Sequence, residues 1–104
     1  MSKFYNITGS TGVTVELIPP AEAADVKSVL ITNVHATADA TVTLFIEDDP
    51  TSGTTSTHNL IHTIAVPANS SLLLDNPFMF RFTNTFGLYT TVGSSDTVDI
   101  MVSI

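Results

Sequence analysis

The chain has 104 residues, which is the length of one ordinary domain with a single hydrophobic core. Three basic residues against ten acidic ones give a formal net charge of -7, and a surface of that sign repels nucleic-acid backbones and anionic lipids. There is no cysteine, so disulfides and thiolate chemistry are excluded. We therefore expect one domain, residues 1–104, that binds neither nucleic acid nor membrane.

Only 12% of the residues are charged, and Thr, Ser and Asn supply much of the polar surface. β-branched Val, Ile and Thr fit a pleated sheet better than a helix, so the composition favours strands. The N-terminus lacks the apolar run of a signal peptide, and no segment is apolar for long enough to span a bilayer. We expect a soluble protein that assembles in a reducing cytoplasm.

The first predicted strand covers residues 13–18, where apolar and polar residues alternate with period two. Two prolines end it, and the stretch 21–24 is the only one with helical propensity, enough for a single turn. The strongest pair of strands follows at 26–34 and 41–47, joined by a short connection.

The strand 41–47 has one apolar face, formed by Val42, Leu44 and Ile46. Phe45 interrupts its polar face. An aromatic side chain in that place either covers the outer side of the sheet or packs against a neighbouring subunit.

The next elements are a polar segment and two strands. Residues 48–57 predict an exposed loop because turn formers and hydroxyl side chains fill it. A strand is expected at 58–66 and, after a tight turn, another at 71–75. The three leucines at 72–74 do not alternate with polar residues, which predicts that both faces of that strand are covered.

Large apolar side chains are concentrated at 78–82, and the last two strands are expected at 86–92 and 97–104. About eight strands at this spacing are typical of sandwiches and barrels. We predict an all-β fold, a two-sheet antiparallel β-sandwich of jelly-roll or immunoglobulin-like topology. Its expected core includes Val15, Leu30, Leu44, Ile64, Leu72, Leu88 and Ile100.

Metal binding is not expected at the three histidines or at the acidic loop. His58 and His62 lie on the same side of a strand, but four residues of strand separate them by about 13 Å, too far to share one ion. They could meet across a symmetry axis of an oligomer, but surface or interface histidines are the expected interpretation, also for His35. Asp48 and Asp49 lack the ligand spacing of an EF-hand.

No motif for catalysis is present. The chain has no nucleophile elbow of the Gly-x-Ser-x-Gly type, no glycine-rich phosphate loop and no cysteine. It has no tryptophan and only two tyrosines, which disfavours a stacking platform for sugars. We expect no catalytic residue, no cofactor and no enzymatic activity.

Four runs, Val26–Ile46, Ile64–Asn76, Gly87–Val92 and Thr97–Val102, resemble small β-sandwich virion structural proteins of tailed bacteriophages. The first run resembles the paired strands of those proteins, with an apolar strand ending in Thr-Asn, a short polar turn and a Val-x-Leu-x-Ile strand, and the other three runs continue the similarity. The resemblance implies a capsid decoration or cement protein of the virion. It also implies a homo-oligomer, expected to be a trimer, bound to the lattice of the major capsid protein.

Five residues are candidates for the subunit or lattice interface: Phe45, Phe78, Met79, Phe80 and Phe82. For the cluster at 78–82, filling of the sandwich core is the alternative. The alternative function is a glycan- or receptor-binding accessory module of a phage tail or neck, in which the loop 48–57 would hold the ligand, because loops on rigid sandwiches commonly carry binding sites.

Overall fold

The computed structural model describes residues 2–8, 14–19, 26–48, 56–75, 86–93 and 96–104. These residues form eight strands and contain no helix. The strands are β1 (Ser2–Thr8), β2 (Thr14–Ile18), β3 (Ser28–Asn33), β4 (Ala40–Asp48), β5 (Thr57–Val66), β6 (Ser71–Leu74), β7 (Phe86–Val92) and β8 (Thr97–Ser103).

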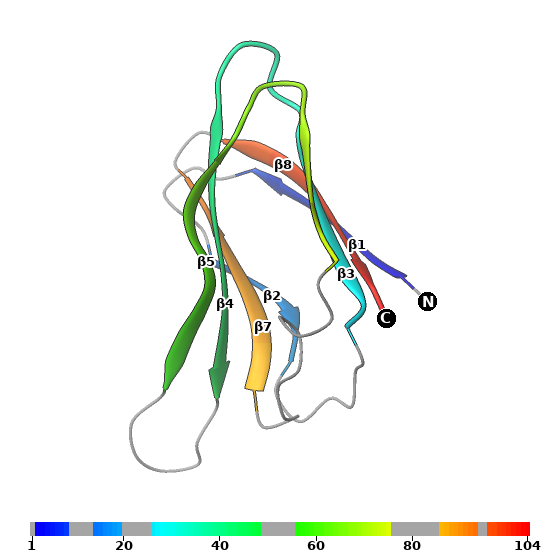
Figure 1. Cartoon of the computed structure of the whole chain (residues 1–104), viewed down its shortest axis with the longest axis vertical. Helices are drawn as coiled ribbons and strands as arrows, with labels where there is room; N and C mark the ends of the chain where they lie inside the picture. Colours follow the sequence, from blue (N-terminus) through cyan, green and yellow to red (C-terminus); the bar gives the residue numbers. More distant parts are fainter. Residues whose placement is uncertain (1, 9–13, 20–25, 49–55, 76–85, 94–95) are drawn as a thin grey trace.

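The strands form two four-stranded antiparallel sheets that face each other (Figure 1). Sheet A has the order β1-β8-β3-β6, and sheet B has the order β2-β7-β4-β5. The pairs β1–β8, β2–β7, β3–β6 and β4–β5 are those of one long hairpin rolled into two layers, which is a jelly roll. The predicted β-sandwich is confirmed, and this strand order differs from that of immunoglobulin domains.

The core fills the space between the two sheets. Strand alternation explains its composition, because every second residue of β3, β4, β7 and β8 turns inward. Leu44, Leu88 and Ile100, all expected in the core, are at most 1% exposed. Val15 and Leu72 are partly buried and pack against that core.

Two expected core residues, Leu30 and Ile64, lie elsewhere. Val29 and Ile31 are completely buried, so Leu30 between them must point to the outer face of sheet A. Ile64 is 40% exposed and lies on the edge strand β5, beside an irregularity at Thr63 whose φ is 49°. The prediction that Leu30 and Ile64 belong to the core was therefore wrong, because it rested on their apolar character alone.

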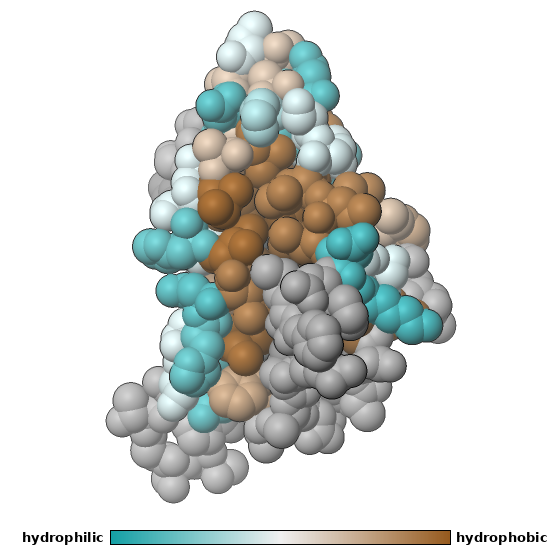
Figure 2. All heavy atoms as spheres, viewed as in Figure 1, coloured by the Kyte–Doolittle hydropathy of each residue, from teal (hydrophilic) through white to brown (hydrophobic). Residues whose placement is uncertain are grey.

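The strand with three leucines also differs from expectation. β6 is an edge strand of sheet A, and its Leu73 is 55% exposed while Leu72 and Leu74 are partly buried. The prediction that both faces of this strand are covered was wrong. Figure 2 shows apolar atoms gathered on the side of the sandwich where β5 and β6 lie.

β1 is a strand that the sequence-based prediction missed. It pairs with β8 over seven consecutive residues, and this pairing places the two ends of the described chain side by side (Figure 1). The signal was present in the alternation of Tyr5 and Ile7, which turn toward the core, with Phe4 and Asn6, which are exposed. The helical turn predicted at 21–24 lies outside the described residues.

β2 contains a bulge, and a hydrogen bond beside this bulge connects β2 of sheet B with β1 of sheet A. The register of β2 against β7 shifts between Glu16 and Ile18, so Leu17 and Ile18 are both buried although they are neighbours. The Tyr5 hydroxyl donates a hydrogen bond to the carbonyl oxygen of Leu17. This contact runs from sheet A to sheet B.

Candidate interaction face on sheet A

The outer face of sheet A carries a row of apolar side chains that crosses all four strands. The register pairs Phe4 with Met101, Met101 with Leu30, and Leu30 with Leu73. Residues directly opposite each other in antiparallel strands point to the same face of the sheet, so the four side chains form one line. We call these four residues the apolar row.

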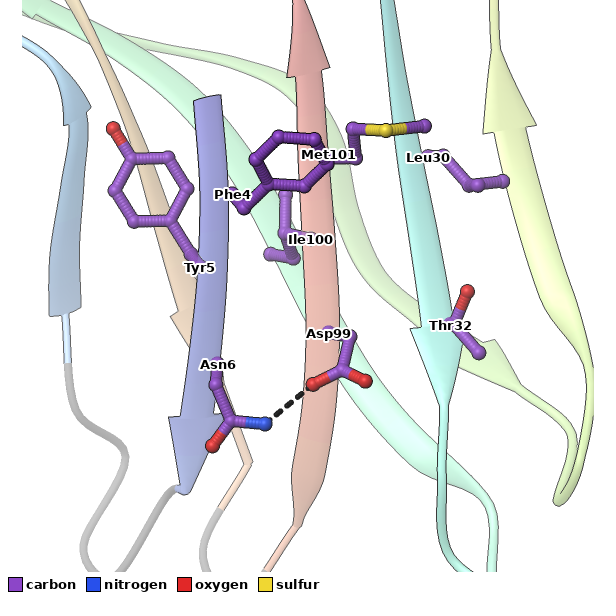
Figure 3. Close-up of a pocket in the computed structure, with 8 residues that line it drawn as sticks. All are labelled: Phe4, Tyr5, Asn6, Leu30, Thr32, Asp99, Ile100 and Met101. Atoms are coloured by element: carbon purple, nitrogen blue, oxygen red, sulfur yellow. Dashed lines mark hydrogen bonds between the residues drawn. The ribbon is translucent and has the colours of Figure 1, made fainter. Parts of the chain in front are cut away.

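The ends of the apolar row are the most exposed. Phe4 is 73% exposed and Leu73 is 55% exposed, whereas Leu30 and Met101 between them are half-buried. Figure 3 shows Phe4, Met101 and Leu30 at the same height on adjacent strands, with the Met101 side chain extending from β8 across β3. Exposed apolar side chains that adjoin one another are more informative than a single exposed residue, because contiguous apolar surface marks contacts with other molecules.

A polar row runs beside the apolar row. It consists of Asn6, Asp99, Thr32 and Ser71, which are again opposite each other on the four strands. The Asn6 side-chain amide donates to the Asp99 carboxylate, and the Thr32 and Ser71 hydroxyl oxygens are 2.9 Å apart. These side chains bind one another along the sheet and leave the apolar row uncovered.

An open hollow of about 440 Å³ lies over the part of the two rows that belongs to β1, β8 and β3. Its walls come from β1, β8 and β3, and Figure 3 shows that Tyr5 points away from Phe4. On the other side of the apolar row, the register places the serines Ser2, Ser103 and Ser28. Among the residues that the register pairs in these three rows, Asp99 is the one carboxylate, and the exposed Asp75 follows Leu73 by two residues just beyond the end of β6.

The outer face of sheet B is built differently. Phe45, one of the predicted interface residues, lies there half-buried and stacks on Tyr89 with ring centroids 5.6 Å apart. The Tyr89 hydroxyl donates to the Glu16 carboxylate over 3.1 Å. The interaction of Phe45 is thus made within the chain, in agreement with the interpretation that it covers the sheet. Phe78, Met79, Phe80 and Phe82 lie outside the described residues.

The three histidines lie in separate surroundings. His35 Nδ1 accepts hydrogen bonds from the backbone N–H groups of Thr37 and Ala38, at 3.3 and 3.2 Å. The His58 ring meets the edge of Phe86 with centroids 5.7 Å apart, and His62 Nδ1 is 3.2 Å from the hydroxyl of the adjacent Thr63. Among the described residues no group of three or more His, Asp or Glu side chains is arranged to hold a metal ion.

Only the base of the predicted binding loop 48–57 is described. Asp48 Oδ1 accepts a hydrogen bond of 2.7 Å from the Ser56 N–H, and the Asp48 N–H donates to the Ser56 carbonyl over 3.2 Å. The Thr57 hydroxyl donates to the Glu47 carboxylate over 2.9 Å. Residues 49–55, which include Asp49, lie outside the description.

Sequence reasoning did not identify the apolar row. Leu30 was assigned to the core, Leu73 to a strand covered on both faces, and Phe4 and Met101 were not singled out. Each strand contributes one residue to the apolar row. The four residues are far apart in the sequence, and only the register between the strands brings them together.

Within the described ranges, no helix has the length and apolarity needed to cross a membrane. The chain matches no known protein family, no curated protein and no solved structure.

Proposed function

We propose that the chain is a non-enzymatic structural protein of a phage virion, a capsid decoration or cement protein that binds the lattice of the major capsid protein through the outer face of sheet A. The observation that carries this proposal is the apolar row, whose directly paired neighbours on the four strands include one carboxylate, Asp99. A surface with an apolar centre, polar neighbours and few charges has the composition of the buried part of a protein–protein interface.

The architecture alone does not decide the function. Jelly rolls occur in viral capsid proteins and also in lectins, so the fold is compatible with both the structural and the glycan-binding alternative. The face of sheet A favours the structural alternative, because Phe4 and Leu73 offer apolar area in place of the hydrogen-bonding groups that orient a sugar. Burying one fully exposed Phe side chain is worth about 1.5–3 kcal/mol.

The expected partner surface is a protein surface with apolar side chains opposite the row and without acidic clusters. An acidic partner would be repelled by a chain with a net charge of -7, and the hydrogen-bonded Asp99 lies directly beside the row. Self-association and binding to the lattice both belong to the proposal.

The first test is mass spectrometry of purified virions from the source of the chain. We expect the chain in stoichiometric amounts, retained on the particle after washing. Its absence from virions would overturn the proposal.

The second test is co-sedimentation of the purified chain with particles that lack it. Met101→Asp places a charge in the middle of the apolar row and should abolish binding. Thr91→Asp is the matched control, because Thr91 is also half-buried but lies on sheet B. Equal binding of both folded variants would contradict the assignment of the face. A glycan array with specific hits would favour the tail or neck module instead.

A further inference from the structure

The four edge strands of the sandwich differ in how well they could accept another strand. An edge strand presents unpaired N–H and C=O groups, and proteins usually protect it by shortness, bulges, proline or charged side chains, above all lysine. β6 has four residues. β2 has five residues, a register shift and Pro19 directly after it. β5 has two register shifts and a residue, Thr63, with a positive φ of 49°.

β1 has no bulge, no proline and no shortening, and its one protective feature is the charge of Lys3. Its seven residues pair with β8 without any shift in register, and no described strand pairs with its other side. It is therefore the one long and regular edge among the described strands. A regular edge of this kind is a template for the addition of a strand.

We propose that β1 pairs with β1 of a second copy of the chain, antiparallel and about a two-fold axis that passes beside Phe4. Sheet A of one copy then continues into sheet A of the other. The two apolar rows become one line, in which Phe4 of each copy lies opposite Phe4 of its mate.

The apolar row determines the register. With Phe4 on the axis, Lys3 lies opposite Tyr5 and Ser2 opposite Asn6 of the second copy. With Tyr5 on the axis, Phe4 would lie opposite Asn6 and the row would be broken. Because a one-residue slip exchanges the side chains that meet on a face, the apolar row favours the first register. Aromatic side chains directly opposite each other stabilise a strand pair.

Charge also favours a second copy at this edge. The sequence of β1, SKFYNIT, contains a lysine and no carboxylate, in a chain that has ten acidic residues. Two acidic molecules can therefore approach along β1 without bringing carboxylates of this strand together. The pairing also shields Phe4, which is 73% exposed in the single chain. It gives a dimer in place of the trimer that the resemblance implies, and it does not depend on the proposed binding to a capsid lattice.

Cysteine cross-linking can test the register because the chain has no cysteine of its own. Ser2→Cys and Asn6→Cys are prepared separately, and each keeps Phe4. Within the proposed pair, position 2 lies about 13 Å from position 2 of the mate, and position 6 lies equally far from its own copy, too far for a disulfide. Position 2 instead faces position 6 of the mate. We expect a disulfide-linked dimer only when the two variants are mixed under mild oxidation.

Leu73→Cys is the control, since Leu73 is an exposed member of the same row but lies on β6 at the far edge of the sheet. Cross-linking of Leu73→Cys alone, of Tyr5→Cys alone, or of none of these samples would overturn the proposed pairing. Light scattering of the unmodified chain should give the dimer mass, and Phe4→Asp should weaken the dimer by roughly tenfold or more. A strict monomer at high concentration would contradict the inference even if the chain is found in virions.

Discussion

The outer faces of the two sheets differ in where their aromatic side chains find partners. On sheet B, Phe45 stacks on Tyr89, and Tyr89 bonds Glu16, so the aromatic pair is held within the chain. On sheet A, Phe4 stands at the end of the apolar row and is 73% exposed. The comparison suggests that sheet B's face contributes to the stability of the single chain, whereas sheet A's face contributes mainly to binding. Substitutions in the core and on the two faces test this division.

The largest effect on the free energy of unfolding is expected at Asn33, because this residue of sheet A bonds Val66 of sheet B. Its side chain is completely buried at the end of β3, where Nδ2 donates to the carbonyls of Ala38 and Val66 at 2.9 and 3.0 Å. Oδ1 accepts from the His35 N–H at 2.9 Å. Asn33→Asp turns both donors into an acceptor facing two carbonyls, which should lower the free energy of unfolding by about 2–4 kcal/mol in urea titrations.

The control for Asn33 is Asn69→Asp. Asn69 is exposed and has a positive φ of 57°, which Asp also tolerates, and its amide makes one longer contact of 3.3 Å with the Ala36 carbonyl. We expect a change of about 0.5 kcal/mol or less. Equal losses for the two variants would mean that the buried hydrogen bonds of Asn33 do not hold the sheets together.

A moderate effect on the free energy of unfolding is expected at Thr90, which lies on the inner side of sheet B. Thr90 is completely buried and its hydroxyl donates to the Thr43 carbonyl at 3.0 Å, next to the irregular part of β5. Thr90→Val keeps the shape and removes the donor, so we expect a loss of about 1–2 kcal/mol. Thr91→Val, on the outer face, should cost less than about half a kcal/mol. Thermal unfolding of both variants gives the comparison, and a neutral Thr90→Val would contradict it.

The aromatic pair of sheet B should show a measurable coupling. A double-mutant cycle with Phe45→Leu and Tyr89→Leu should give a coupling energy of about 0.5–1.5 kcal/mol. Phe4→Leu combined with Tyr89→Leu is the additive control, because these residues lie on different sheets. Coupling in the control, or none in the stacked pair, would remove the difference between the faces.

The smallest effect on stability is expected at Phe4. Because its side chain is largely exposed, Phe4→Ser should change the free energy of unfolding of the single chain by about 0.5 kcal/mol or less. Urea titration at low protein concentration, where the monomer dominates, is the measurement. A loss similar to that of a core substitution would show that Phe4 supports the fold, and the binding role of the apolar row would lose its basis.

Local alternation in the sequence was sufficient to predict most of the sandwich. The pattern holds for all inward residues of β4. It also holds in β8, where Val98, Ile100 and Val102 are buried. The pattern failed in β5, where the bulges shift the alternation partway along the strand. It also failed for Leu30, since an apolar residue on an outer face has the same local sequence signature as one in the core.

The candidate site was harder to predict than the fold. The apolar row takes one residue from each of four strands, and β1 and β8 lie near opposite ends of the sequence. Its existence depends on pairing over long distances along the chain, which no local window of sequence contains. The strand order 1-8-3-6 supplies that information.

The pairing of β1 with β8 has a consequence for how the chain folds. β1 has no other described strand as a partner, so during synthesis it must wait until β8 has left the ribosome. Contacts between such distant segments slow folding, because a large loop must close before they form. Since Ser2 and Ser103 are opposite each other, joining the two ends by a short linker would turn this pair into a local hairpin. A circular permutant of that kind should fold faster than the original chain while keeping the same two faces.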